Sequence, residues 1–198
     1  MAEHTGGMVA LIPADPGPLL IDGGEPADEL HVTLAYLGDD VTGWSDEQRS
    51  DILTAAQSMA AEQPGPIEAR AFAHATFNPD GHADREPCAV YLIGDSGAPL
   101  DLHQRFAPLA SADQHPGYVA HLTAGYGKTA ADLTYTGPVT FDRLRVALGD
   151  DVHDFPLSPA SDDEPATFAA ARRVRTPAGR ERYDKPIGSK IGKKVRKR

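Results

Sequence analysis

The chain alternates short apolar runs with segments rich in glycine and proline, a pattern that predicts many short strands and few helices. Strand-like runs, rich in aliphatic and β-branched residues, occupy residues 8–13, 30–37, 67–77, 88–93, 118–126, 139–148 and 152–157. Ser45 and Gln48 have the spacing of a capping box, which predicts that a helix begins here and continues until Pro64. A second helix is predicted over residues 99–107.

These elements follow one another in a repeated order, β-β-α-β and then β-α-β-β, so the chain divides into two similar halves. The pattern predicts an α+β domain over residues 1–157. The composition then changes: residues 158–171 form an acidic linker of proline, alanine and serine, and residues 172–198 are basic without a sustained apolar period. Such a segment buries too little apolar surface to offset its chain entropy, so we expect a disordered tail.

The net charge of -10 is the sum of two very different parts. Residues 172–198 contain 12 basic and 2 acidic residues, a charge of +10, whereas the rest of the chain contains 7 basic and 27 acidic residues, a charge of -20. Affinity for polyanions comes largely from lysine and arginine, so long RNA is a poor substrate for the acidic body. The tail is suited to bind nucleic acid, an acidic protein partner or the body itself.

Several classes of protein are excluded by the composition. Cys88 is the single cysteine, which excludes an intrachain disulfide and any zinc site of several cysteines, and its apolar strand predicts an inert thiol. The sequence has no signal-peptide pattern and no apolar run of membrane-spanning length. We therefore expect a cytoplasmic protein with no membrane contact, and no spacing of residues indicates a metal or another cofactor.

A short motif occurs twice, 90 residues apart, with the pattern H-Φ-T-x-x-Y, where Φ is aliphatic. It begins at His31 and again at His121, and each copy falls in the second predicted strand of its half. Side chains alternate along a strand, so each histidine shares a face with the threonine two residues later, Thr33 or Thr123.

Two imidazoles and two hydroxyls, if the halves pack with two-fold symmetry, suit a phosphodiester substrate. A neutral histidine removes a proton from the nucleophile, and a protonated one gives a proton to the leaving oxygen. The threonine hydroxyls donate hydrogen bonds to the phosphate oxygens as charge develops. No metal is needed for this chemistry.

Aromatic and basic residues near the motifs are candidates for substrate binding. Tyr36 and Tyr126 lie five residues after their histidines, which on a regular strand places them in the core. The glycines that flank Tyr126 are able to kink its strand and bring Tyr126 or Lys128 toward the phosphate. Tyr118, three residues before His121, has the same parity and becomes available for base stacking only if it lies in a loop.

The paired motifs resemble those of the 2H phosphoesterase superfamily, which includes 2′-5′ RNA ligase-like proteins and cyclic phosphodiesterases. The resemblance covers about residues 6–157 and implies a bilobal α+β fold, with antiparallel sheets around a central cleft and two pseudo-symmetric β-α-β lobes. It also implies metal-independent chemistry on nucleotide phosphodiesters such as 2′,3′-cyclic phosphates, 2′-5′ linkages or small cyclic oligonucleotides. The catalytic set that it implies is His31, Thr33, His121 and Thr123.

Residues 175–188 are similar to C-terminal segments of actinobacteriophage proteins encoded among head-assembly functions. This second resemblance implies a phage origin, with either the host cytoplasm or the virion as the location. Two alternatives to an enzyme therefore stay open. One is a phage head-assembly or virion component whose basic tail binds capsid protein or DNA, and the other is a nucleotide- or RNA-binding module without activity.

Overall fold

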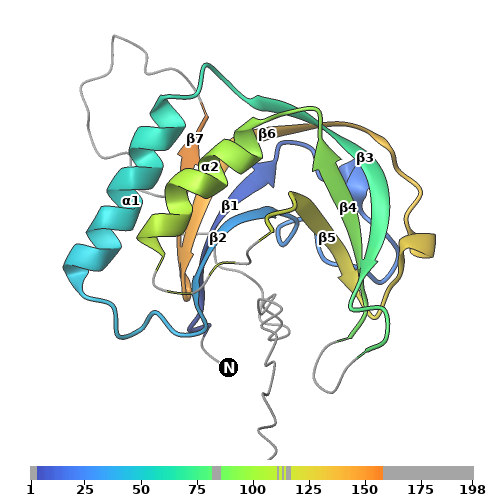
Figure 1. The fold of residues 1–198 in the computed structure, drawn as a ribbon, viewed down its shortest axis with the longest axis horizontal. Helices are drawn as coiled ribbons and strands as arrows, with labels where there is room; N and C mark the ends of the chain where they lie inside the picture. Colours follow the sequence, from blue (N-terminus) through green and yellow to red (C-terminus); the bar gives the residue numbers. More distant parts are fainter. Residues whose placement is uncertain (1–3, 82–85, 111, 113, 115–116, 158–198) are drawn as a thin grey trace, which may run out of the picture.

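A computed structural model describes residues 4–157 except 82–85, 111, 113, 115 and 116. The seven strands are β1 (Gly7–Pro13), β2 (Val32–Gly38), β3 (Ile67–Phe77), β4 (Cys88–Gly94), β5 (His121–Tyr126), β6 (Gly137–Leu148) and β7 (Asp151–Pro156). The two α-helices are α1 (Asp46–Ala61) and α2 (Ala98–Phe106), and three short 3-10 turns are η1 (Gly17–Leu19), η2 (Ala107–Leu109) and η3 (Ala130–Asp132). Figure 1 shows their arrangement.

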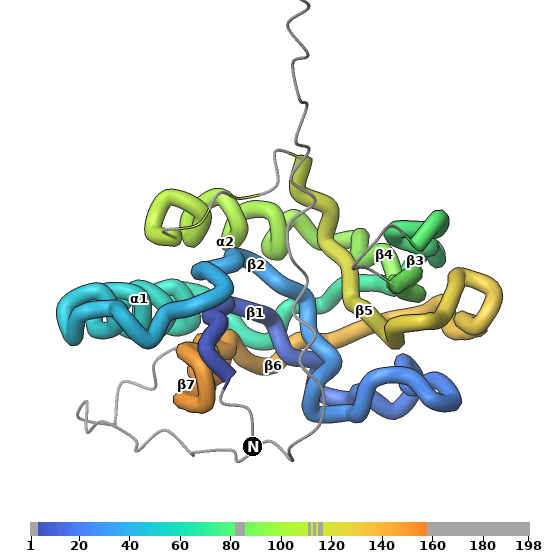
Figure 2. Tube along the Cα trace, turned by 90° about the horizontal axis from the view of Figure 1, so that it is seen from below, coloured from blue at the N-terminus to red at the C-terminus, as the bar shows by residue number. Residues whose placement is uncertain are grey.

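All pairings in the sheet are antiparallel, in the order β1-β2-β5-β4-β3-β6-β7, and β1 also pairs with β6. Strand β6 serves two groups of strands: residues 137–141 pair with β3, whereas residues 141–148 pair with β1. We call β1, β2, β7 and the end of β6 the first lobe, and β3, β4, β5 and the start of β6 the second lobe. The two lobes meet again where β2 and β5 lie next to one another (Figure 2).

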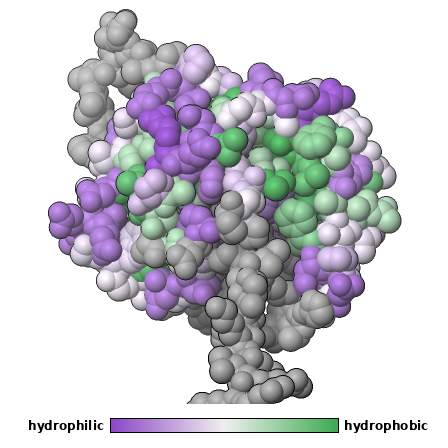
Figure 3. Space-filling model, viewed as in Figure 1, coloured by the Kyte–Doolittle hydropathy of each residue, from purple (hydrophilic) through white to green (hydrophobic). Residues whose placement is uncertain are grey.

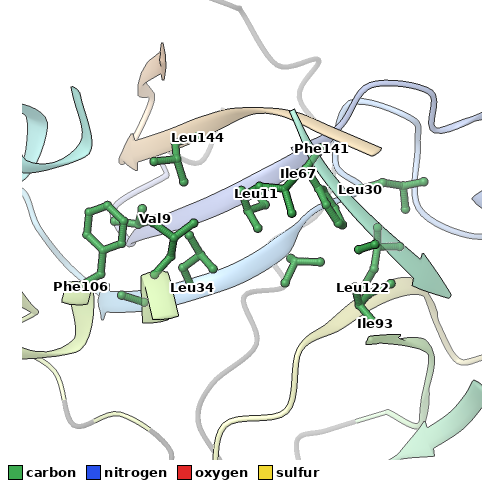
Figure 4. Packing of buried hydrophobic residues seen from close by; sticks show 14 of the residues in the cluster. Val9, Leu11, Leu30, Leu34, Ile67, Ile93, Phe106, Leu122, Phe141 and Leu144 are labelled. Carbon is green, nitrogen blue, oxygen red and sulfur yellow. The ribbon is translucent and has the colours of Figure 1, made fainter. Parts of the chain in front are cut away.

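Both helices lie against strands of the first lobe. Helix α1 packs against β6 and β7, and α2 packs against β2 (Figure 1). Figure 4 shows Phe106 of α2 beside Val9 of β1, and the same cluster of buried side chains continues to Leu122 of β5. One apolar core therefore runs from the helices through both lobes and supports β2 and β5 from behind.

The predicted α+β class and the order of its elements are confirmed, and so is the capping box at Ser45, whose side chain accepts from the Gln48 amide while the Gln48 side chain accepts from the Ser45 amide. The predicted helix is found in each half of the sequence, and both helices pack against strands of the first lobe. The domain boundary predicted at residue 157 stays a prediction. The predicted linker and basic tail, residues 158–198, lie outside the described residues.

Candidate functional site

The two copies of the motif lie side by side, because Val32 of β2 is the antiparallel partner of Leu122 of β5. These two side chains are fully buried in the core. The motif residues on either side of them are half-buried and point to the other side of the sheet, which we call the motif face; they are His31, Thr33, His121 and Thr123. In an antiparallel pair, this register makes His31 a neighbour of Thr123 and His121 a neighbour of Thr33.

Each histidine of the motif is oriented by the same local hydrogen bond. Nδ1 of His31 lies 2.6 Å from the carbonyl oxygen of Glu29, and Nδ1 of His121 lies 2.8 Å from the carbonyl oxygen of Val119. A carbonyl only accepts, so Nδ1 carries the proton in both rings. Nε2 is then the nitrogen that takes up or releases a proton toward a substrate.

Both motif strands contain a β-bulge directly after the threonine. In β2, Thr33 pairs with Ala10 and the next pair is Ala35 with Val9, so Leu34 is the extra residue. In β5, Thr123 pairs with Val90 and the next pair joins Gly125 to Ala89, so Ala124 is the extra residue. A bulge adds one residue to a strand and thereby reverses which face the following side chains occupy.

The bulges correct the prediction that regular alternation places Tyr36 and Tyr126 in the core. Tyr36 pairs with Met8, two residues from the partner of Thr33, and Tyr126 pairs with Cys88, two residues from the partner of Thr123. Both tyrosines therefore return to the motif face, and both are half-buried. The expected kink near the glycines of β5 corresponds to this bulge, in which Gly125 follows the extra residue, whereas β2 forms the same bulge with Ala35 at that position.

Side chains from α2 and from the α2–β5 connection hold the free edge of β2 beyond its pairing with β5. His103 lies with Nδ1 2.6 Å from the carbonyl of Leu34, the bulge residue, and the Tyr118 hydroxyl donates to the carbonyl of Thr33 at 3.2 Å. The rings of His103 and Tyr118 stack with centroids 4.0 Å apart. The Gln114 side-chain amide accepts from the Tyr36 amide at 2.9 Å and donates to the Tyr36 carbonyl at 2.7 Å, as a neighbouring strand would.

This position gives Tyr118 a supporting contact with the first motif, and its use as a stacking platform for a base stays a prediction. Burial raises the pKa of the Tyr118 hydroxyl well above its ordinary value, so the group donates its hydrogen bond throughout the neutral range. The sequence pattern assigned no function to Gln114 or His103. Their contacts are long-range, and no local pattern indicates them.

Backbone from the β1–β2 connection holds the corresponding edge of β5. The Glu25 amide donates to the carbonyl of Ala124, the bulge residue, at 2.8 Å. A Cβ atom on Gly24 would lie 2.4 Å from that carbonyl oxygen, and a Cβ atom on Gly125 would lie 2.9 Å from the Cα atom of Gly24. The close approach of the two backbones therefore requires glycine at both positions.

The side chain of Lys128 lies over glycines of β5 and of the β1–β2 connection. A Cβ atom on Gly125 would lie 3.1 Å from Cγ of Lys128, and a Cβ atom on Gly23 would lie 3.3 Å from its Nζ. Gly125 pairs with Ala89, a core residue, so the lysine stem covers the face of β5 opposite Thr123. A contact between Lys128 and a phosphate stays a prediction.

The motif face continues onto charged side chains in the first lobe. Thr33 pairs with Ala10, which pairs with Arg145 of β6, and Arg145 pairs with Asp154 of β7. Arg145 is buried, and its guanidinium makes two hydrogen bonds of 2.7 and 2.9 Å to Asp154. The sequence analysis missed Arg145, although an arginine within an apolar strand was an available signal.

In the second lobe the corresponding row is apolar. Thr123 pairs with Val90, which pairs with Ala75 of β3. The ring of Phe77, also on β3, lies 4.8 Å from the ring of His121, centroid to centroid, at an angle of 55°. The strand β4 separates β3 from β5, so this contact shows that the second lobe curves around its motif face.

Two further properties concern metals and membranes. Among the described residues, no group of three or more histidine, cysteine, aspartate and glutamate side chains is placed to hold a metal ion. None of the described helices has both the length and the apolar character that crossing a membrane requires.

No protein-family model matches the sequence, and no curated protein matches it. Among solved structures, TT0787 of Thermus thermophilus is similar over 79% of this chain and 100% of its own, with a TM-score of 0.49 and 16% identity. A structure described as a phosphoesterase has the same TM-score and identity over 78% of this chain and 96% of its own. Escherichia coli LigT complexed with 3′-AMP is similar over 78% of this chain and 95% of its own, with a TM-score of 0.47 and 15% identity.

Proposed function

We propose that the protein is a phosphodiesterase of the 2H phosphoesterase type that acts on a small nucleotide without a metal ion. The observation that carries the proposal is the Val32–Leu122 pairing, because it brings two histidines and two threonines onto one face. The two Nδ1–carbonyl hydrogen bonds also support the proposal, because they leave Nε2 of both imidazoles for proton transfer.

The reaction needs two proton transfers, one from the oxygen that attacks phosphorus and one to the oxygen that leaves. Nε2 of one histidine removes a proton from the attacking water or hydroxyl as its oxygen bonds to phosphorus. Nε2 of the other histidine gives a proton to the oxygen that leaves, so the two rings exchange protonation states in one turnover. The hydroxyls of Thr33 and Thr123 donate to the nonbridging oxygens, where negative charge increases in the transition state.

A small substrate is favoured over long RNA. Only 7 of the 19 basic residues lie outside residues 172–198. The two arginines of β6 are balanced by two carboxylates, because Arg145 pairs with Asp154 and Arg143 pairs with both Asp142 and Asp154, so they add little net positive charge. We propose a 2′,3′-cyclic phosphate, a 2′-5′ linkage or a small cyclic oligonucleotide as the substrate, because each presents few phosphates.

The test is a panel of these three substrate classes with the parent protein, His31→Ala, His121→Ala and the double variant, all in the presence of a chelator. We expect each single variant to lose roughly 10²–10⁴-fold in turnover, the usual contribution of a positioned acid or base. His153→Gln, which removes an imidazole of β7 that pairs with Asp151, is the matched control and should retain turnover.

The outcomes separate the proposal from its alternatives. Near-parental turnover in either single histidine variant excludes the mechanism. Binding of a panel member without product, measured by calorimetry, favours a binding module. Recovery of the protein from purified phage particles, with assembly lost when residues 172–198 are removed but kept in the histidine variants, favours a virion component.

A further inference from the structure

Arg145 is a buried charge without a counterpart in the other lobe. Of the charged side chains that the structure describes, it alone is buried, with 8% of its surface exposed. Its Nε donates to one oxygen of Asp154 at 2.7 Å and an Nη donates to the other at 2.9 Å. Burial of a guanidinium is costly unless it is paired and hydrogen-bonded, and this bidentate pair meets that need. The corresponding residue of the second lobe is Ala75.

A third donor of Arg145 reaches the backbone beside the first motif. Its other Nη donates to the carbonyl of Asp28 at 3.3 Å. The carbonyl of the next residue, Glu29, accepts from Nδ1 of His31 at 2.6 Å. One guanidinium therefore joins Asp154 of β7 to the peptide segment that orients His31. The hydrogen bonds that Arg145 donates to Asp154 raise the pKa of Arg145, burial opposes this effect, and the negative charges of Asp154, Glu29 and Asp28 raise the pKa further.

We propose that Arg145 is a positioning residue for His31. By fixing the Asp28–Glu29 backbone, it keeps the Glu29 carbonyl where it holds the Nδ1–H tautomer of the imidazole. The consequence for turnover rests on the proposed function, whereas the consequence for the tautomer does not. His121 depends on the Val119 carbonyl and the Phe77 ring instead, so the loss of Arg145 should leave it unaffected.

The experiment measures the tautomers directly, by long-range ¹H–¹⁵N correlation of the imidazole rings in the full-length protein. In Arg145→Met we expect the Nδ1–H form of His31 to fall from dominant to one part of a mixture, while His121 keeps its parental signals. Arg143→Met is the matched control, because Arg143 is on the same strand and contacts Asp154 at 3.3 Å but makes no hydrogen bond to the segment before His31. Its spectrum should match the parent for both rings.

Two other variants guard against a failure to fold. Arg145→Lys keeps the charge with a single donor group and should give a smaller share of the wrong tautomer, and Asp154→Asn weakens the support of Arg145 without removing it. Parental His31 signals in folded Arg145→Met, or in both of the milder variants, overturn the proposal.

The kinetics provide a second readout. In Arg145→Met we expect kcat to fall about tenfold or more with little change in KM, as for a misplaced reacting group. If the parent has no turnover, the proposed function fails while the tautomer result stands on its own.

Discussion

The two lobes build the same motif geometry with different supports. In each lobe the histidine donates from Nδ1 to the carbonyl two residues earlier, and a bulge follows the threonine. The carbonyl of each bulge residue is bound by a residue from the other half of the sequence: His103 of α2 binds Leu34, and the amide of Glu25, in the β1–β2 connection, binds Ala124. Each motif strand is therefore supported by a contact with the other half of the sequence, in addition to the β2–β5 pairing.

The two lobes differ in the residues that lie next to the motif strands across the sheet. In the first lobe, the row from Thr33 ends on the charged pair of Arg145 and Asp154, whereas the row from Thr123 ends on Ala75. The outer surfaces also differ: in Figure 3 hydrophilic side chains gather over α1 and hydrophobic ones gather over β3 and β4, where Phe72 is 52% exposed. An approximate two-fold in the backbone thus coexists with a charged environment for one histidine and an apolar one for the other.

The largest expected effect tests whether the threonines are equivalent. Thr33→Val and Thr123→Val remove a hydroxyl at nearly constant shape, and each should lower kcat by roughly 10²–10³-fold, the usual cost of one lost donor to a developing charge. Because the register relates the two positions by a two-fold, we expect the two losses to agree within about tenfold. The measurement is kcat and KM on the best panel substrate.

Thr54→Val, at an exposed position of α1, is the control for a general effect of the substitution. A loss confined to one of the two motif threonines would show that the lobes divide the work and that only one hydroxyl holds the phosphate.

The next effect tests the support of the second lobe. Gly24→Ala places a Cβ atom 2.4 Å from the Ala124 carbonyl oxygen and 2.5 Å from Cγ1 of Ile21, so backbone must shift and the Glu25–Ala124 hydrogen bond weakens. We expect the free energy of unfolding, measured with urea, to fall by about 1–3 kcal/mol. Gly43→Ala is the control, because a Cβ atom there meets nothing within 4 Å. Equal stability of the two variants would mean that the close approach of Gly24 to β5 does not support the motif.

The features that could be predicted from the sequence are those that depend on the period of hydrophobic residues and on the spacing of neighbouring residues. The strands, the two helices and the capping box of Ser45 follow from patterns within a few residues, and the faces of His31 and Thr33 follow from strand alternation. The orientation of Tyr36 was predicted wrongly, because a bulge depends on pairing with β1, which lies more than 20 residues away in sequence. The contacts of Arg145 with Asp28 and of Gln114 with Tyr36 could not be predicted for the same reason, because these partners are 117 and 78 residues distant.

The smallest effect distinguishes the two supports by their chemistry, since the first lobe uses an ionisable hydroxyl and the second a backbone amide. Burial raises the pKa of Tyr118, so the folded protein holds this proton more tightly than the unfolded chain does. The corresponding contribution to the free energy of unfolding is complete below the ordinary tyrosine pKa of about 10 and is lost as the pH rises above it, by about 1 kcal/mol near pH 11.

Urea unfolding of the parent and of Tyr118→Phe between about pH 8 and about pH 11 checks this prediction. The free energy of unfolding should fall less with pH in the variant than in the parent. Tyr91, whose pKa is raised by burial and by Tyr135, contributes equally to both proteins, so the difference isolates Tyr118. Parallel curves would contradict a buried, hydrogen-bonded Tyr118 and with it the contact that holds Thr33 from the first lobe's edge.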